Sequence, residues 1–347
     1  MTGRRPRRVL GASARPTSQR QVDAWADYRL PPVECVRPGL WSVPVECLEF
    51  PIRYTLAYLL VGDDGRYIIV DPGWDSGPSR DHLRAGIRTA GLSEEDLVGI
   101  VVTHAHPDHL ALAPAVADHT GSWIGMHPRE VSHLDVHRSA DELVARDQAQ
   151  LSALGVPAGE LDDATPDILE IERYRPARTL DYEIVDGDRL PLVGRDVRAI
   201  WTPGHTDGHL SLVDVDNAVV LTGDHVLPRI SPYVGMLDAT LHDRNSIADY
   251  LSSLELLRPW DGYEVAPAHE YRFENLGDRL DELRDHTQSR SKEVAAVLRE
   301  DPHATVWQIA QRLSWSRGWD SLDGRNRRAA LGETNAHVLH VRLHVRL

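Results

Sequence analysis

The segment Thr103-His104-Ala105-His106-Pro107-Asp108-His109 carries the most information about the fold. It directly follows the apolar run VGIVV at residues 98–102, which predicts a strand. Where a chain leaves a strand still extended, side chains two residues apart point the same way, so His104 and His106 can converge on one metal ion. Asp108 and His109, where the chain turns toward a helix, can bind a second ion close by. Imidazole and carboxylate groups are ligands for zinc and other first-row divalent ions.

Outward from this segment, short apolar runs separated by turn residues predict a series of strands. The GDDG turn at residues 62–65 lies between two of them and indicates a hairpin. Helical patterns alternate with the strands, which is typical of a layered α/β body with its site in the loops. The predicted strands are 40–45, 54–61, 66–71, 98–103, 197–202, 209–215, 218–222 and 263–268, and the predicted helices are 78–91 and 245–258.

Three more potential metal ligands each follow a predicted strand: His205 in TPGHT, Asp224 in TGDH and His269 in PAHE. Each alone is weak evidence, because a histidine at a strand end is usually a solvent-facing or capping residue. Together they complete a first site of three histidines and a second site of one aspartate and two histidines. Asp224 can bridge the two sites.

With these motifs, residues 40–275 resemble the metallo-β-lactamase superfamily, whose VDPG (70–73), THAHPDH, TPGHT, TGDH and PAHE segments occur here in family order. The resemblance implies an αββα sandwich with a dinuclear site between the sheets. It assigns Asp71 to the family's buried supporting aspartate. A bridging aspartate is absent from the family's antibiotic-hydrolysing enzymes, so the chain resembles hydrolases similar to glyoxalase II. The implied ligands are His104, His106 and His205 for the first metal, Asp108, His109 and His269 for the second, and Asp224 for both.

The resemblance also implies a mechanism, in which two cations lower the pKa of a shared water and present it to an electrophilic carbon or phosphorus. We expect zinc, although the ligands also admit iron or manganese. Asp108 is the expected catalytic residue, which orients this water and takes up its proton. His209 and His225 are expected to support the ligands from behind. Tyr233, Tyr271 and Arg272 are expected to line the substrate pocket.

The chain divides by composition into a disordered basic tail (1–25), the catalytic domain (40–275) and a helical module (276–347). The module has a helical pattern after Thr305, and its last seven residues alternate like a strand. It resembles the winged-helix-type tail of the LACTB2-like subgroup, some of whose members act on RNA. The stretch 126–190 is expected to be mostly helical and to cover the pocket.

The 347 residues carry 38 Lys+Arg against 53 Asp+Glu, a net charge of −15, although residues 1–20 hold six arginines. An acidic body repels polyanions, which disfavours nucleic acid as the main partner. Cys35 and Cys47 are too few for a disulfide scaffold, and no apolar run is long enough for a membrane span. A cytoplasmic location is expected, and the oligomeric state is not predicted.

The leading hypothesis is hydrolysis of a small ester, thioester or lactone. The alternative is a phosphodiesterase or endoribonuclease of the LACTB2-like type. Iron-dependent oxygen chemistry is disfavoured because the related diiron proteins carry Glu where His106 stands and add a flavin domain. A DNA-binding protein with a structural metal is disfavoured because structural zinc sites normally close at four ligands around one ion.

Overall fold

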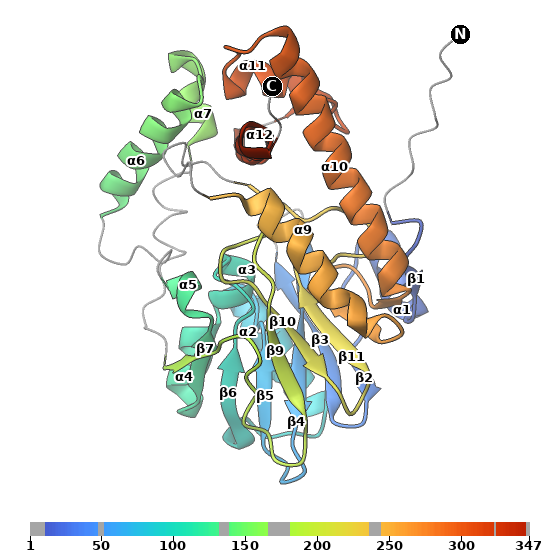
Figure 1. The fold of residues 1–347 in the computed structure, drawn as a ribbon. Coiled ribbons are helices and arrows are strands. Elements are labelled where there is room, and N and C mark those ends of the chain that lie inside the picture. Colours follow the sequence, from blue (N-terminus) through green and yellow to red (C-terminus); the bar gives the residue numbers. More distant parts are fainter. Residues whose placement is uncertain are drawn as a thin grey trace.

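The computed structural model describes residues 11–47, 52–131, 139–165, 181–235, 244–322 and 324–344. Within these residues, two sheets lie face to face (Figure 1). The first, here called the seven-stranded sheet, is antiparallel from β2 to β5 and parallel from β5 to β8. Its order is β2(Glu34–Arg37), β3(Leu40–Cys47), β4(Arg53–Val61), β5(Tyr67–Val70), β6(Leu97–Val101), β7(Trp123–Met126) and β8(Tyr182–Glu183).

The second sheet, here called the six-stranded sheet, combines the start of the described chain with its later part. All its neighbouring strands are antiparallel except β11 and β12. Its order is β1(Arg15–Pro16), β13(Phe273–Glu274), β12(Glu264–Pro267), β11(Val219–Gly223), β10(Leu210–Asp214) and β9(Val197–Trp201). The strands predicted from 40 to 268 all lie within these two sheets, and the GDDG hairpin joins β4 to β5.

The core between the sheets follows from the alternation of side chains along the strands. In β4, Leu56, Tyr58 and Leu60 face the inter-sheet core, where Leu212 and Leu221 of the other sheet meet them. The intervening residues of β4 belong to a separate cluster on the outer face of the sheet.

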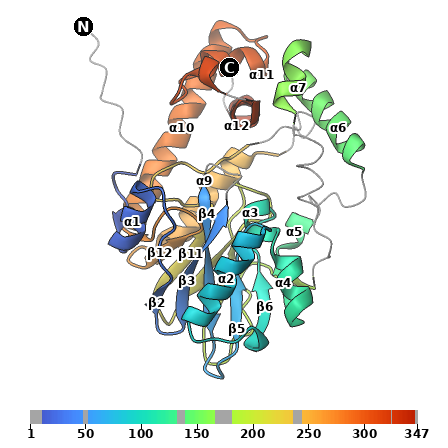
Figure 2. The same ribbon diagram turned by 180° about the vertical axis from the view of Figure 1, so that it is seen from behind.

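Helices cover both outer faces. α2(Gly77–Thr89) and α4(Ala113–Thr120) pack on the seven-stranded sheet (Figure 2). α9(Ser246–Leu257) and the first half of α10(Leu276–Glu300) pack on the six-stranded sheet. The predicted αββα sandwich is therefore confirmed.

A helical layer lies at one end of the sandwich (Figures 1 and 2). It consists of α6(Ala140–Ala153), α7(Leu161–Ala164), the second half of α10, α11(Val306–Arg312) and α12(Gly324–His344). Leu151 and Ala164 share one apolar cluster with Leu298, Ile309 and Val341. Part of the 126–190 stretch and the C-terminal module therefore pack together, while residues 132–138 and 166–180 lie outside the described residues. α10 packs in both the sandwich and the helical layer. The expected domain boundary at residue 276 therefore coincides with the start of α10, and packing is continuous across it.

The C-terminal module differs from the expectation in one respect. Thr305 caps α11 as predicted, with a capping box to Gln308. The alternating residues 341–347 predicted a strand, but residues 341–344 continue α12, so that prediction is wrong for these four residues, and residues 345–347 lie outside the described part. Val338 and Val341 lie three residues apart and are both buried in the helical layer, which favours a helix. Among the described residues after 276 no strand occurs, so the winged-helix comparison gains no support.

The N-terminal tail is also more ordered than expected. Residues 1–10 lie outside the described part, but residues 11–26 include β1 and α1(Gln19–Ala26), which Ser18 caps. Gln21 is fully buried, and its side chain donates to Ser42 Oγ and accepts from Arg272 N. The prediction of disorder is therefore wrong for residues 11–25.

None of the helices in the described ranges combines the length and the apolar character that a membrane span requires.

Candidate metal centre

The predicted ligands come from four loops that leave strands of both sheets. His104 and His106 follow β6 and precede α3(Pro107–Leu110), whose first turn holds Asp108 and His109. The loops after β9, β11 and β12 carry His205, Asp224 and His269. α3 lies at the end of the sandwich that faces the helical layer (Figures 1 and 2). The fold brings all seven predicted ligands together in two adjoining groups.

The first group joins His104, His106 and His205, with Asp224 beside them. The His104 Nε2 atom lies 2.9 Å from His106 Nδ1 and 3.1 Å from His205 Nε2. The third side of this triangle, from His205 Nε2 to His106 Nδ1, is also 3.1 Å. Three imidazole nitrogens at these separations can face one cation with Zn–N bonds of about 2.0–2.1 Å.

Hydrogen bonds on the outer side of the rings fix which nitrogen carries the lone pair. His205 Nδ1 donates to the carbonyl oxygen of Tyr233 at 2.6 Å. The Thr103 hydroxyl donates to Asp71, so it must accept from His104 Nδ1 at 3.1 Å. In a neutral ring the other nitrogen is then an acceptor. His104 and His205 therefore point lone pairs at each other, an arrangement that a cation between them would stabilise.

The second group joins Asp108, His109 and His269. His109 Nδ1 donates to Asp71 at 2.8 Å and His269 Nδ1 donates to the Tyr54 carbonyl at 3.0 Å, so both Nε2 atoms turn inward. Both atoms are buried and face the carboxylate oxygens Asp108 Oδ2 and Asp224 Oδ1, and none of these four atoms makes a well-oriented hydrogen bond among the described residues. Buried polar atoms without a hydrogen bond are rare. This donor set fits a divalent cation.

Asp224 lies between the groups. Its Oδ1 atom is 3.0 Å from His269 Nε2 and 3.6 Å from His109 Nε2, while Oδ2 is 3.7 Å from His205 Nε2. One carboxylate oxygen thus faces each group, as a bridging ligand requires.

The electrostatics of the two groups differ. Burial lowers the pKa of His106 to about 3, and the pKa of His104 falls well below its usual value for the same reason. Burial would also lower the pKa of His269, but the carboxylates of Asp224 and Asp108 outweigh it and raise that pKa to about 10. The negative potential that holds a proton on His269 also favours a metal cation at this place.

The predicted supporting residues lie behind the ligands. Asp71 has a left-handed φ of 52° and accepts from Thr103 N, from Thr103 Oγ1 and from His109. A non-glycine residue in this region is strained, which is common at functional sites. His209 accepts from Asp224 N at 3.2 Å and so positions Asp224 between the two groups. His225 is buried between the rings of His209 and Tyr250, and neither of its ring nitrogens has a hydrogen-bond partner among the described residues.

The three predicted substrate contacts have different surroundings. Tyr233 reaches the first group through its carbonyl oxygen, which accepts from His205. Tyr271 is buried, and burial together with neighbouring Glu270 raises the pKa of its hydroxyl. The guanidinium of Arg272 is held by Glu264 at 2.6 Å and Glu34 at 2.8 Å, where it joins the two sheets. The structure gives Arg272 a structural role and does not bring it to the ligands.

One buried residue that the sequence did not single out is Glu130 on α5(Pro128–Val131). Its carboxylate accepts from Ala105 N at 2.7 Å and from Gly208 N at 2.6 Å. It therefore joins the loop of His104 and His106 to the loop of His205. A single glutamate in a short helix has no distinguishing local pattern, so only the fold shows this link.

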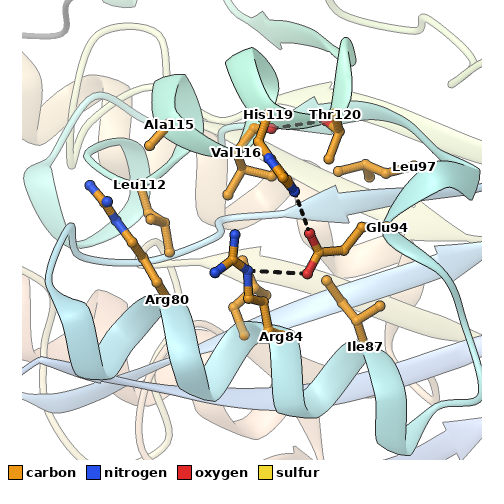
Figure 3. A pocket seen from close by; sticks show the side chains of 11 residues that line it. Arg80, Arg84, Ile87, Glu94, Leu97, Leu112, Ala115, Val116, His119 and Thr120 are labelled. Atoms are coloured by element: carbon orange, nitrogen blue, oxygen red, sulfur yellow. Dashed lines mark hydrogen bonds and ion pairs between the residues drawn. The ribbon is translucent and has the colours of Figure 1, made fainter.

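A pocket of about 240 Å³ lies elsewhere, between α2 and α4 (Figure 3). Glu94 crosses it and pairs with Arg84 at 3.2 Å and with His119 at 3.0 Å. Arg80 at its rim pairs with Asp75. None of its lining residues belongs to the two ligand groups.

The chain is similar to known proteins over the region that holds the ligands. The family model described as "Metallo-beta-lactamase superfamily" matches residues 51–269. The "Beta-lactamase-like protein 2 homolog" of Caenorhabditis elegans is 24% identical over 78% of this chain and 74% of its own length. The "Probable metallo-hydrolase YqjP" of Bacillus subtilis is 25% identical over 76% and 82%, respectively. An "Atrochrysone carboxyl ACP thioesterase" of Aspergillus chevalieri is 29% identical over 72% and 62%.

Among solved structures, that of a metallo-beta-lactamase family protein from Thermus thermophilus is similar with a TM-score of 0.73. The two chains are 27% identical, and the match covers 89% of this chain and 95% of the other. The similarity therefore extends beyond the sandwich into the helical layer.

Proposed function

Because this chain belongs to the metallo-beta-lactamase superfamily and is a metallo-hydrolase of that fold, we propose that it cleaves a small ester, thioester or lactone. The observation that carries the proposal is the pair of ligand groups whose inward lone pairs meet across Asp224. This donor set suits two zinc ions, and the same ligands accept iron or manganese.

Two divalent ions held by these two ligand groups would supply a water of lowered pKa and would polarise the scissile carbonyl oxygen. The side chains of this protein do the rest. The backbone carbonyl oxygen of Asp108 accepts from Thr55 Oγ1 at 2.7 Å, which fixes the position of this residue. Its carboxylate orients the attacking water and takes up its proton. His209 holds the backbone of Asp224, and Asp71 holds the ring of His109, so the ligands keep their direction during the reaction.

Two observations support an acyl substrate. The net charge of −15 disfavours a long polyanion such as RNA. A relative that matches over 72% of this chain carries the name of a thioesterase. Tyr233 and Tyr271 are proposed to line the pocket, the former from its place beside His205.

The test is metal analysis of the purified protein together with a panel of substrates. The panel contains a thioester, a p-nitrophenyl ester, a lactone, bis-p-nitrophenyl phosphate and a labelled single-stranded RNA. About two equivalents of metal with turnover of an acyl substrate would support the proposal. Cleavage of the phosphodiester or RNA alone would replace it with the nuclease alternative, and absence of bound metal would refute the role of the histidines.

A further inference from the structure

The Glu130 carboxylate connects the two sheets at the metal centre. Ala105, one of its partners, lies between the ligands His104 and His106 in the loop after β6 of the seven-stranded sheet. Gly208, the other partner, precedes β10 of the six-stranded sheet and lies three residues after His205. The distance between these loops sets the separation of the histidines in the first group.

The approach of Gly208 to α5 is close enough to require glycine. A Cβ atom at Gly208 would lie 2.8 Å from both the backbone nitrogen and Cγ of Glu130. The two backbone hydrogen bonds of 2.6 and 2.7 Å therefore depend on tight packing of the loop against the helix.

The charge of Glu130 is also significant. Its side chain is only 1% exposed, and both oxygens bind neutral backbone groups. A buried carboxylate without a counter-charge is unstable. Asp71, Asp108, Asp224 and Glu130 are four buried carboxylates at this centre, and two divalent cations would balance their charge.

We propose that Glu130 is a positioning residue of the metal centre: it holds the His104–His106 loop against the His205 loop and supplies a buried negative charge that the first cation requires. This inference rests on the proposed function, because it presumes a cation in each ligand group. Substitution of Glu130 should weaken metal binding by the first group and leave metal binding by the Asp108, His109 and His269 group largely unchanged.

Two variants distinguish the effect of the Glu130 charge from the effect of its side-chain length. Glu130→Gln has nearly the same shape, but its amide offers one acceptor oxygen, and its NH₂ group would face a backbone N–H. Glu130→Asp keeps the charge but is too short by one methylene to reach both loops. Gly208→Ala keeps Glu130 and displaces its carboxylate. Asp214→Asn is the matched control, since Asp214 is a fully buried acid at the other end of β10, paired with Arg195.

Stepwise zinc affinity of the full-length protein, measured by competition with a chromophoric chelator, is the readout. For Glu130→Gln we expect one equivalent to bind about 10- to 100-fold more weakly and the other to stay within about twofold. Gly208→Ala should show the same selective loss, and Asp214→Asn should show none. Unchanged affinity in both Glu130→Gln and Gly208→Ala would overturn the proposal, as would an equal loss at both equivalents. If the unaltered protein bound no zinc, iron or manganese, the proposed function itself would fail. Circular dichroism establishes that each variant is folded, and if Glu130→Gln is not, Gly208→Ala decides.

Discussion

The Nε2 atoms of His104 and His205 lie 3.1 Å apart, and hydrogen bonds to Thr103 and Tyr233 leave a lone pair on each. Two such acceptors repel each other in the absence of a cation, and the buried carboxylates of Asp108 and Asp224 add to the cost. The folded state of the metal-free protein is therefore strained at this centre.

Metal removal should destabilise the protein. A ligand present at one hundred times its dissociation constant stabilises the folded state by about 2.7 kcal/mol. We expect a chelator to lower the melting temperature by several degrees and two equivalents of zinc to restore it, as measured by differential scanning calorimetry. A melting temperature that responds to neither treatment would contradict the assignment of the ligands.

Asp108→Ala should reduce turnover by at least about 10²–10⁴-fold, the usual contribution of a group that handles the proton, and His269→Ala should also abolish most of the turnover because it removes a metal ligand. Both remove a ligand of the second group and leave the sandwich core untouched. The panel substrate with the highest turnover provides the assay. His119→Ala, in the pocket of Figure 3, is the control and should retain activity. Activity retained in both ligand variants would refute the dinuclear mechanism.

Gly204→Ala should weaken zinc binding as well as stability. Gly204 precedes His205, has a φ of 137°, and a Cβ atom there would lie 2.5 Å from the Cα of Tyr250 on α9. The backbone strain costs about 1–3 kcal/mol, and the clash would push the His205 loop away from the site. Gly262→Ala has a positive φ of 96° with no atom within 4 Å, so it should lose stability only. Thermal unfolding and zinc titration of the two variants distinguish strain from displacement, and equal zinc affinity would show that the loop absorbs the clash.

His337 on α12 should make the protein sensitive to acid. Burial first, and then nearby Arg290, lower the pKa of this histidine to about 3. Between pH 6.5 and 3 the unfolded chain therefore binds a proton that the folded chain does not, so stability falls as the pH falls through this window. The loss is about 1.4 kcal/mol per pH unit, and above pH 6.5 it disappears.

His337→Gln removes this titration and can keep a hydrogen bond to Ser291 Oγ, which lies 2.9 Å from His337 Nδ1. The difference in unfolding free energy between the unaltered protein and the variant should shrink by about 2 kcal/mol from pH 6.5 to pH 5. Urea denaturation at both pH values measures it. A constant difference would mean that His337 is solvated or protonated in the folded state.

Local patterns in the sequence predicted the strands of the sandwich and the residues at their ends. Each predicted ligand lies in the segment that follows a strand, Asp108 and His109 within the first turn of α3, so its position depends on a few neighbouring residues and on the sheet that the strand joins. Arg272 lies only three residues after His269, but its guanidinium is bound by Glu264 on β12 and by Glu34 on β2, which is 238 residues away in sequence. No local pattern contains that information.

The same reason applies to Glu130 and to the N-terminal segment. Glu130 contacts the metal-ligand loops because α5 packs between two of them. Gln21 is buried because β1 and α1 pack at the edge of the six-stranded sheet. The composition of residues 11–25 resembles a solvated tail, yet Gly11 and Gln21 have hydrogen-bond partners 271 and 251 residues away. Composition cannot show partners at such separations.

The pairing of β1 with β13 has a consequence for synthesis on the ribosome. Glu282 on α10 accepts from Gly11 N across 271 residues. The first described residues can therefore adopt their final position only after nearly the whole sandwich has been synthesised. Contacts of such high sequence separation form late. During translation the edge of the nascent six-stranded sheet therefore stays open until α10 has emerged. Over that interval the nascent chain is exposed to proteases and to pairing with other chains.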